Sequence, residues 1–255
     1  MLNYLKTGSG NTTLVLIHGY CENNTCFTEQ VLFFKDHATV IAIDLPGFGS
    51  SPSKAGITIE QMAELVQDVL AHENIQECIL IGHSMGGYVT LAFAELFPSM
   101  LLGFGLIHST TFADTDERKA KRLQVISFIE ENGKEAYIKN FIPGLFAPTT
   151  SKEISSRAIS EGLISDAEGI KAAALAMKDR PDRSFILKQT NLPVFFGIGK
   201  LDALIPEQAM FEQAAMCNKA YVAYLQKSAH MGMMEESIFL NQEILGFINL
   251  ANLNK

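Results

Sequence analysis

The sequence predicts an α/β protein built on a mostly parallel sheet of about eight strands flanked by helices. Strand-like and helix-like runs alternate along the chain, and several strand-like runs are continuously apolar, as strands buried on both faces are. No strand pattern occurs between residue 111 and about residue 184, where the patterns are helical. This last observation predicts a helical segment inserted into the alternating fold.

The expected strands are short apolar runs bounded by turn residues. They lie over residues 2–7 and near 14–18, 38–43, 77–81, 102–108, 193–198 and 220–225. Thr58 and Gln61 have the spacing of a capping box, which predicts the start of a helix that runs through Leu70. A helix near 236–250 is expected to end the fold.

The insertion of about 70 residues is too long for a plain connection between two strands. Its helical patterns lie near 115–132, 134–141, 151–163 and 166–178. Ser165 and Glu168 have the spacing of a second capping box. We therefore expect a core domain formed by 1–110 and 185–255. A helical cap over 111–184 is expected between its sixth and seventh strands.

Composition limits the classes of partner. The chain has 255 residues, within the range of one α/β domain, and its net charge of −8 argues against a nucleic-acid-binding face. Basic residues cluster once, in 117–122, where interleaved acids predict a solvated helix face. No apolar run approaches the roughly 20 residues that cross a bilayer. The first residues show no signal-peptide pattern, so we expect a cytoplasmic protein without membrane partners.

The four cysteines, at positions 21, 26, 78 and 217, have scattered spacings. They form neither a Cys-x-x-Cys pair nor a cluster with histidine, so we expect no metal site and no cofactor. Reduced thiols also fit a cytoplasmic location.

Ser84 is the candidate nucleophile. It stands in the frame Gly-His-Ser-Met-Gly (82–86), after the apolar run 78–81 and before the helix-forming run 88–97. A serine on a sharp strand-to-helix turn exposes its hydroxyl to a cleft, and the flanking glycines allow the turn to pack tightly. The bare pattern arises by chance in about one chain in ten of this size, so partners are required.

A serine nucleophile needs a base and a group that orients the base. His230 is the one histidine on a late loop after a strand, and Asp202 follows the strand at 193–198. Taken alone, such a histidine is commonly a surface residue, and Asp202, which precedes Pro206, also suits a helix cap. However, all three residues follow separate strands in the chain order Ser–Asp–His, which predicts a catalytic triad.

Two backbone N–H groups are expected to stabilise an oxyanion. Met85 follows the nucleophile at the start of a helix, and Tyr20 follows the His18-Gly19 turn after an early strand. The His18-Gly19 pair also suits a plain strand-ending turn.

Several motifs together resemble the α/β-hydrolase superfamily over essentially the whole chain. They are Leu-Ile-His-Gly-Tyr (16–20), Asp-Leu-Pro-Gly-Phe-Gly-Ser-Ser (44–51), Gly-His-Ser-Met-Gly-Gly (82–87), Gly-Lys-Leu-Asp (199–202) and Ala-His-Met-Gly (229–232). The chain looks like the single-domain esterase, lactonase and C–C hydrolase branch. The resemblance implies that Ser84, Asp202 and His230 are catalytic, that Tyr20 and Met85 form the oxyanion hole, and that the cap shapes the substrate pocket.

The expected activity is that of a carboxylesterase-like serine hydrolase. It would cleave a small, uncharged carboxylic ester, thioester or lactone through an acyl-enzyme on Ser84, with water as co-substrate. Serine at this position argues against the dehalogenase and epoxide-hydrolase branches, which need an aspartate there. A C–C bond hydrolase and a cofactor-free perhydrolase or haloperoxidase would use the same triad. A catalytically silent ligand receptor on the same fold is a further alternative.

The expected pocket is largely apolar, like most ligand sites. Its candidate lining residues are His18, Phe128, Tyr137, Phe141, Phe146, Leu175 and Met177. Apolar residues at helical spacing more commonly pack inside the protein. The physiological substrate and the choice between a monomer and a homodimer stay open at this level.

Overall fold

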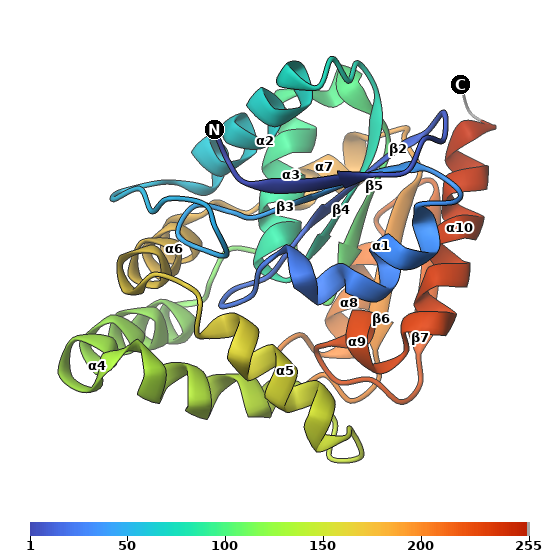
Figure 1. Cartoon of the computed structure of the whole chain (residues 1–255). Coiled ribbons are helices and arrows are strands. Elements are labelled where there is room, and N and C mark those ends of the chain that lie inside the picture. Colours follow the sequence, from blue (N-terminus) through green and yellow to red (C-terminus); the bar gives the residue numbers. More distant parts are fainter. Residues whose placement is uncertain (254–255) are drawn as a thin grey trace.

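The computed structural model describes residues 1–253 and contains a sheet with the strand order β1-β3-β2-β4-β5-β6-β7 (Figure 1). The strands are β1 (Tyr4–Thr7), β2 (Thr13–Ile17), β3 (Thr39–Ile43), β4 (Cys78–His83), β5 (Leu101–Ile107), β6 (Val194–Gly199) and β7 (Ala220–Leu225). Among the described strand pairs, only β1–β3 is antiparallel. The described sheet has seven strands rather than about eight, one for each of the seven strand runs identified in the sequence.

Helices cover both faces of the sheet. Within residues 1–253 they are α1 (Thr28–Phe34), α2 (Ile59–His72), α3 (Met85–Leu96), α4 (Asp116–Phe141), α5 (Lys152–Gly162), α6 (Ala167–Asp179), α7 (Ser184–Gln189), α8 (Glu207–Ala214), α9 (Gly232–Glu235) and α10 (Ser237–Asn252). One face packs against α2, α3, α7 and α8, and the other against α1 and α10 (Figure 1). Strands β2, β4 and β6 are buried along their whole length, as their continuous apolar runs predicted.

The two predicted capping boxes have different outcomes. At the start of α2, Thr58 Oγ1 accepts a hydrogen bond from Gln61 N, and Gln61 Oε1 accepts one from Thr58 N. The second prediction is wrong. Helix α6 begins at Ala167, so Asp166 rather than Ser165 occupies the N-cap position, and its side chain makes no capping bond. Ser165 lies one residue too early to cap this helix.

The chain between β5 and β6 forms α4, α5 and α6, which lie together on one side of the molecule (Figure 1). Gly133, with φ +81°, interrupts α4 where the sequence predicted a break between two helices. This helical segment follows the fifth strand rather than the expected sixth, since the sheet has seven strands. The short helix α7 had no distinct sequence pattern.

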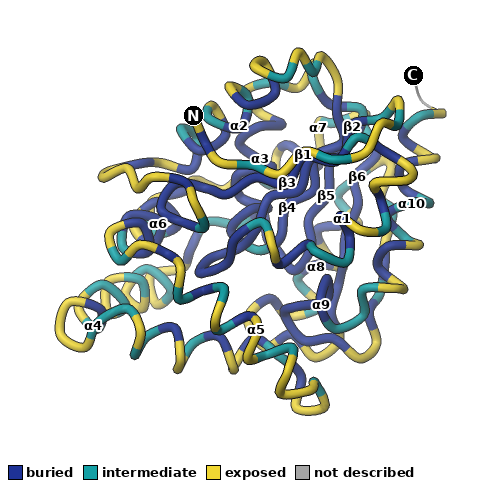
Figure 2. Tube along the Cα trace, in the orientation of Figure 1, coloured by how far each residue is buried: buried dark blue, intermediate teal, exposed yellow. Residues whose placement is uncertain are grey.

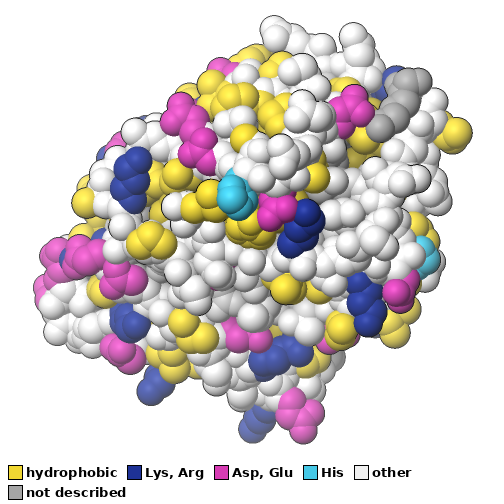
Figure 3. Space-filling model, turned by 45° about the horizontal axis from the view of Figure 1, so that its top comes forward, with side chains coloured by type: hydrophobic (Ala, Val, Ile, Leu, Met, Phe, Trp, Pro, Cys, Tyr) yellow, Lys and Arg dark blue, Asp and Glu magenta, His cyan; other side chains and the backbone are white. Residues whose placement is uncertain are grey.

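The strands are far more buried than α4 and α5, whereas most residues of α6 are buried. Figure 2 shows buried strands at the centre and long exposed stretches along α4 and α5. On the face in Figure 3, acidic and basic side chains are interspersed rather than gathered into one patch. No helix within residues 1–253 combines the length and apolar character that a membrane-spanning segment needs.

Helix α6 is joined to the core by a close backbone contact. Gly47, in the loop after β3, has φ +85°, and its carbonyl oxygen accepts a hydrogen bond from Asp166 N at 2.9 Å. A Cβ atom added to Gly169 would lie 2.4 Å from Gly47 Cα. Tyr20 Oη also donates to the carbonyl oxygen of Ile170 at 3.0 Å. The contact therefore has no room for a side chain at position 169.

We expect Gly169→Ala to lower the melting temperature by about 2–10 °C, because the added methyl group forces two backbone segments apart. Gly144→Ala is the matched control, since a Cβ atom there meets nothing within 4 Å. Thermal unfolding followed by circular dichroism measures both variants. Equal melting temperatures for the two variants would show that position 169 does have room for a side chain.

Candidate active site

Ser84 occupies the sharp turn between β4 and α3, with φ 48° and ψ −113°. Positive φ is unusual for a residue with a side chain, and surrounding contacts hold it. Ser84 N donates to Ile107 O at 2.9 Å, and Ser109 Oγ donates to Ser84 O at 2.7 Å. Gly86 lets α3 approach β2, because a Cβ atom there would lie 2.2 Å from Ile17 O. The strand-to-helix turn predicted from the sequence is thus present.

Asp202 and His230 meet at the carboxyl ends of β6 and β7. His230 Nδ1 lies 2.8 Å from Asp202 Oδ2, and both residues are buried. The other carboxylate oxygen accepts hydrogen bonds from Leu204 N at 2.8 Å and Ile205 N at 3.0 Å. Asp202 therefore organises the turn before α8 and orients the imidazole as well. Because Nδ1 of His230 contacts Asp202, Nε2 is the ring nitrogen of His230 that remains available to other groups.

Ser84 and His230 line one cavity of about 390 Å³. Helix α4 supplies much of the cavity wall, and Met177 of α6 and the loop after β6 supply further parts. The lining residues are Tyr20, Glu22, Ser84, Tyr88, Arg118, Lys121, Arg122, Val125, Tyr137, Phe141, Leu145, Met177, Ala203, Leu204, Ile205 and His230. The residues proposed as nucleophile and base thus face a common space of ligand size.

Two backbone N–H groups near the cavity are unpaired within the described part of the chain. Met85 is the first residue of α3, and Tyr20 follows the turn after β2. Within residues 1–253, neither N–H donates a hydrogen bond to a protein acceptor. These are the two donors that the sequence assigned to the oxyanion.

The expected apolar pocket residues divide into two groups. Tyr137, Phe141 and Met177 line the cavity. His18 does not, because its Nε2 accepts a hydrogen bond from Leu45 N at 2.9 Å, and its Nδ1 lies 2.7 Å from Gly19 O. His18 thus fixes the turn that carries Tyr20.

The remaining pocket expectations are also wrong. Phe128 lies outside the lining and packs on Tyr137, with the ring centroids 6.3 Å apart. Phe146 packs against the hydrophobic core, and Leu175 lies partly exposed on α6. Helical spacing identified the apolar side chains but could not determine which of them face the cavity.

The expectation of a solvated face for 117–122 holds for Glu117 and Lys121, which are exposed, but it missed that Arg118, Lys121 and Arg122 also line the cavity. The basic run was the sequence signal for this feature. Sequence reasoning assigned it to solvent because alternating charges at helical spacing do not reveal which turn of a helix faces a cleft.

Two further histidines lie behind His230. His83 Nε2 is 2.8 Å from the His230 carbonyl oxygen, and its Nδ1 is 2.9 Å from Glu22 Oε2. Burial lowers the pKa of His83, but the Glu22 carboxylate and these hydrogen bonds outweigh burial and raise the pKa above its usual range. The pKa of Glu22 is lowered, since His83 and the Gly19 N–H outweigh its burial. This pair fixes the backbone of His230.

His108 lies on the other side of Asp202. Its Nε2 accepts a hydrogen bond from Gly232 N at 3.1 Å, so Nδ1 carries the proton and faces Asp202 Oδ2 at 3.3 Å. Burial lowers the pKa of His108 to about 4 and so keeps it neutral near pH 7. Burial would raise the pKa of Asp202, but His230 and His108 hold it well below its usual range. Asp202 is therefore a carboxylate between two imidazoles.

Among the described residues, one set has potential metal ligands close enough together to hold an ion, namely His108, Asp202 and His230. Their ligand atoms lie within 4.8 Å of one another. These atoms already contact each other, since Asp202 Oδ2 faces both Nδ1 atoms. A metal ion here would have to displace both contacts, so the arrangement fits an orienting carboxylate better than a metal centre.

The chain belongs to the α/β-hydrolase family. A family model described as alpha/beta hydrolase fold matches residues 12–237. This agrees with the parallel sheet and the strand-turn-helix at Ser84.

Similar curated proteins include the dihydrolipoyllysine-residue acetyltransferase component of the acetoin cleaving system from Pseudomonas putida. The identity is 32% over 250 residues, covering 94% of this chain and 64% of that protein. The chain thus spans less than two thirds of this relative's length. A pimeloyl-[acyl-carrier protein] methyl ester esterase from Sodalis glossinidius is 23% identical over 98% of this chain and 99% of its own.

Two solved structures show similar folds. A thermophilic esterase from Thermogutta terrifontis with malate bound is 28% identical, with a TM-score of 0.94 over 98% of this chain and 93% of that one. The enol-lactonase from Burkholderia xenovorans LB400 is 21% identical, with a TM-score of 0.85 over 97% of this chain and 96% of that one. At this lower identity, the likeness concerns the fold alone.

We expect His108 to make the protein less stable in mild acid. Between pH 6.5, the ordinary histidine pKa, and its folded pKa of about 4, the unfolded chain binds a proton that the folded chain excludes. The free energy of unfolding therefore falls as the pH is lowered through this window, by up to about 1.4 kcal/mol per pH unit. His108→Asn removes this contribution, and asparagine tolerates the φ of 47°.

Denaturant unfolding at pH 6.5, 5.5 and 4.5 measures the effect. The free energy of unfolding should depend less steeply on pH in His108→Asn than in the unmodified protein. The exposed His72 provides the control variant His72→Asn, which should retain the full dependence. Equal slopes for the unmodified protein and His108→Asn would show that His108 is not held neutral.

Proposed function

We propose that the protein is a serine hydrolase that cleaves a small carboxylic ester, thioester or lactone through an acyl-enzyme on Ser84. One observation carries the proposal. Ser84 and His230 line the same cavity, while His230 Nδ1 lies 2.8 Å from Asp202 Oδ2. A nucleophile, a base and an orienting carboxylate are the groups that acyl transfer through serine requires. The esterases among the similar proteins support this class of reaction.

In the first half of the reaction, Ser84 Oγ attacks the substrate carbonyl carbon as His230 Nε2 takes the hydroxyl proton. The carbonyl π electrons move onto oxygen, where the N–H groups of Tyr20 and Met85 stabilise the charge. Each such donor contributes about 3 kcal/mol to the transition state. The bond from carbon to the leaving group then breaks, and His230 returns the proton to that group.

Water completes the cycle. It attacks the acyl carbon as His230 Nε2 removes its proton, and the second tetrahedral intermediate releases the acid and Ser84. Asp202 remains a carboxylate throughout and stabilises the imidazolium form of His230. The low pKa of Asp202 suits this role, because the carboxyl group stays ionised at neutral pH.

We further infer that residues 111–184 act as a cap over Ser84. Helices α4 and α6 contribute Tyr137, Phe141 and Met177 to the wall of the cavity that Ser84 also lines. His230 N donates to Leu145 O at 2.9 Å, so the segment is hydrogen-bonded to the loop that carries the base. A cap in this place excludes water and selects the substrate.

We expect Ser84→Ala to lower kcat on a short-chain ester such as p-nitrophenyl acetate by about 10⁴-fold or more, because the acyl-enzyme can no longer form. A fluorophosphonate probe should label the unmodified protein once, at Ser84, as measured by intact mass and peptide mapping. Ser53, exposed in the loop after β3, gives the control Ser53→Ala, which should be labelled fully.

A folded protein that the probe leaves unlabelled would contradict the proposal. Tight binding of an ester without turnover, unaffected by Ser84→Ala, would instead support the receptor alternative.

A further inference from the structure

Three basic residues on one face of α4 line the cavity that holds Ser84. Arg118, Lys121 and Arg122 have the i, i+3 and i+4 spacing that places side chains together on a helix. Glu22 is the acidic lining residue. The lining therefore carries a net charge of +2 with histidines neutral, although the whole chain carries −8. The cavity attracts anions in a protein that is otherwise acidic.

The Arg122 guanidinium is fixed in place from one side. Its Nε donates to Asp114 Oδ2 at 3.1 Å, and the Asp114 side chain is fully buried. Within residues 1–253, the terminal nitrogens of Arg122 make no hydrogen bond. Its side chain is 23% exposed and lines the cavity. An oriented guanidinium with free terminal N–H groups matches the geometry of a carboxylate.

Arg122 is not needed to neutralise Asp114. Arg180 Nη1 already lies 2.8 Å from Asp114 Oδ1, and the Arg180 guanidinium stacks on the Tyr88 ring at 3.8 Å. Two guanidinium groups thus share one carboxylate, which leaves one uncompensated positive charge at the cavity wall. Burying such a charge is costly unless a partner arrives, and a substrate anion would be that partner.

The other charged lining residues have assigned contacts. Arg118 Nη2 donates to Leu204 O at 2.7 Å and so connects α4 to the loop after β6. Lys121 pairs with Glu117 in solvent, where screening weakens it. Glu22 is occupied by His83 and by the Gly19 N–H. Arg122 is therefore the lining cation that a fully buried carboxylate holds through Nε while its terminal nitrogens stay free within the described residues.

We infer that the substrate carries a free carboxylate remote from the scissile bond and that Arg122 binds it. The substrate class is the monoester of a dicarboxylic acid, in place of the uncharged ester that the apolar cap residues suggested. This inference rests on the proposed hydrolysis at Ser84. Tyr137, Phe141 and Met177 would contact the methylene chain between the two ends.

The test compares three methyl esters with the unmodified protein: monomethyl adipate, dimethyl adipate and methyl hexanoate. The first carries the carboxylate, the second masks it, and the third replaces it by an apolar end. One charge-assisted pair predicts a kcat/KM about 10- to 100-fold higher for monomethyl adipate than for either neutral ester. Monomethyl succinate and glutarate then report the spacing between Arg122 and the reacting carbon.

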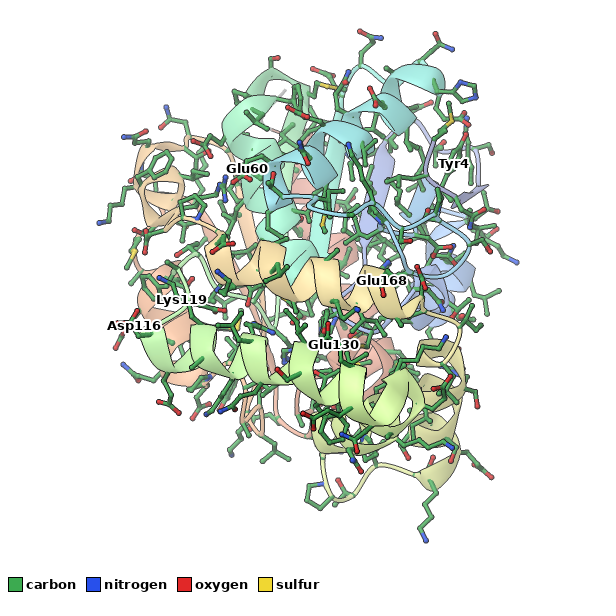
Figure 4. The ribbon with its side chains drawn as sticks, turned by 90° about the vertical axis from the view of Figure 1, so that its left-hand side faces the viewer. Tyr4, Glu60, Asp116, Lys119, Glu130 and Glu168 are labelled. Carbon is green, nitrogen blue, oxygen red and sulfur yellow. The ribbon has the colours of Figure 1, made fainter. Side chains whose placement is uncertain are left out.

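Arg122→Gln should reduce the ratio of kcat/KM for monomethyl adipate over methyl hexanoate to about one. The control is Lys119→Gln, which removes the same charge from α4 outside the cavity lining. Lys119 Nζ lies 3.9 Å from Asp116 Oδ1 near the start of that helix (Figure 4). Because Lys119 does not line the cavity, Lys119→Gln should leave the ratio unchanged. The comparison of the three esters uses the unmodified protein, so it remains a valid test even when the Arg122→Gln variant does not fold.

Equal or faster hydrolysis of the neutral esters by the unmodified protein would overturn the inference. If the fluorophosphonate probe still labels Ser84 in that case, the proposed hydrolase function stands. A ratio that Arg122→Gln leaves unchanged in folded protein would overturn the role of Arg122. Absence of both labelling and ester turnover would overturn the proposed function and this inference with it.

Discussion

The structure depends on the close approach of α3 to β2 and β4, which the turn at Ser84 requires. A Cβ atom on Gly82 would lie 2.2 Å from Gly86 O, and one on Gly86 would lie 2.2 Å from Ile17 O. Any larger residue would lift α3 from the sheet and relax the positive φ of Ser84. This constraint holds the serine hydroxyl and the Met85 N–H in fixed positions at the carboxyl edge of the parallel strands.

Behind that edge, buried charge is arranged in two carboxylate–imidazole pairs. Glu22 pairs with His83, which contacts the His230 backbone, and Asp202 lies between His230 and His108. A buried carboxylate is stable only with compensating donors, so each pair supports the other's geometry. His230 is consequently held through both its ring and its carbonyl group.

The helical segment between β5 and β6 determines the character of the cavity. Its aromatic residues provide apolar walls, while Arg118, Lys121 and Arg122 of α4 bring positive charge toward Ser84. Helix α6 is joined to the core through Gly47 and Gly169, where two backbones touch, and α4 packs on α6 (Figures 1 and 4). The position of the charged face thus follows from backbone packing at a distance from the reacting groups.

The sequence by itself determined the strands, the helices of 111–184 and the roles proposed for Ser84, Asp202 and His230. Apolar runs, turn residues and chain order are local or sequential signals, and parallel strands bring their carboxyl ends to one edge. The tertiary structure decided which side chains face the cavity. It placed His18 and Phe128 outside the lining and Arg122 within it, and it brought His83 and His108 against His230 and Asp202. Helical spacing gives a side chain's direction only relative to its own helix, so its neighbours depend on how that helix docks on the sheet.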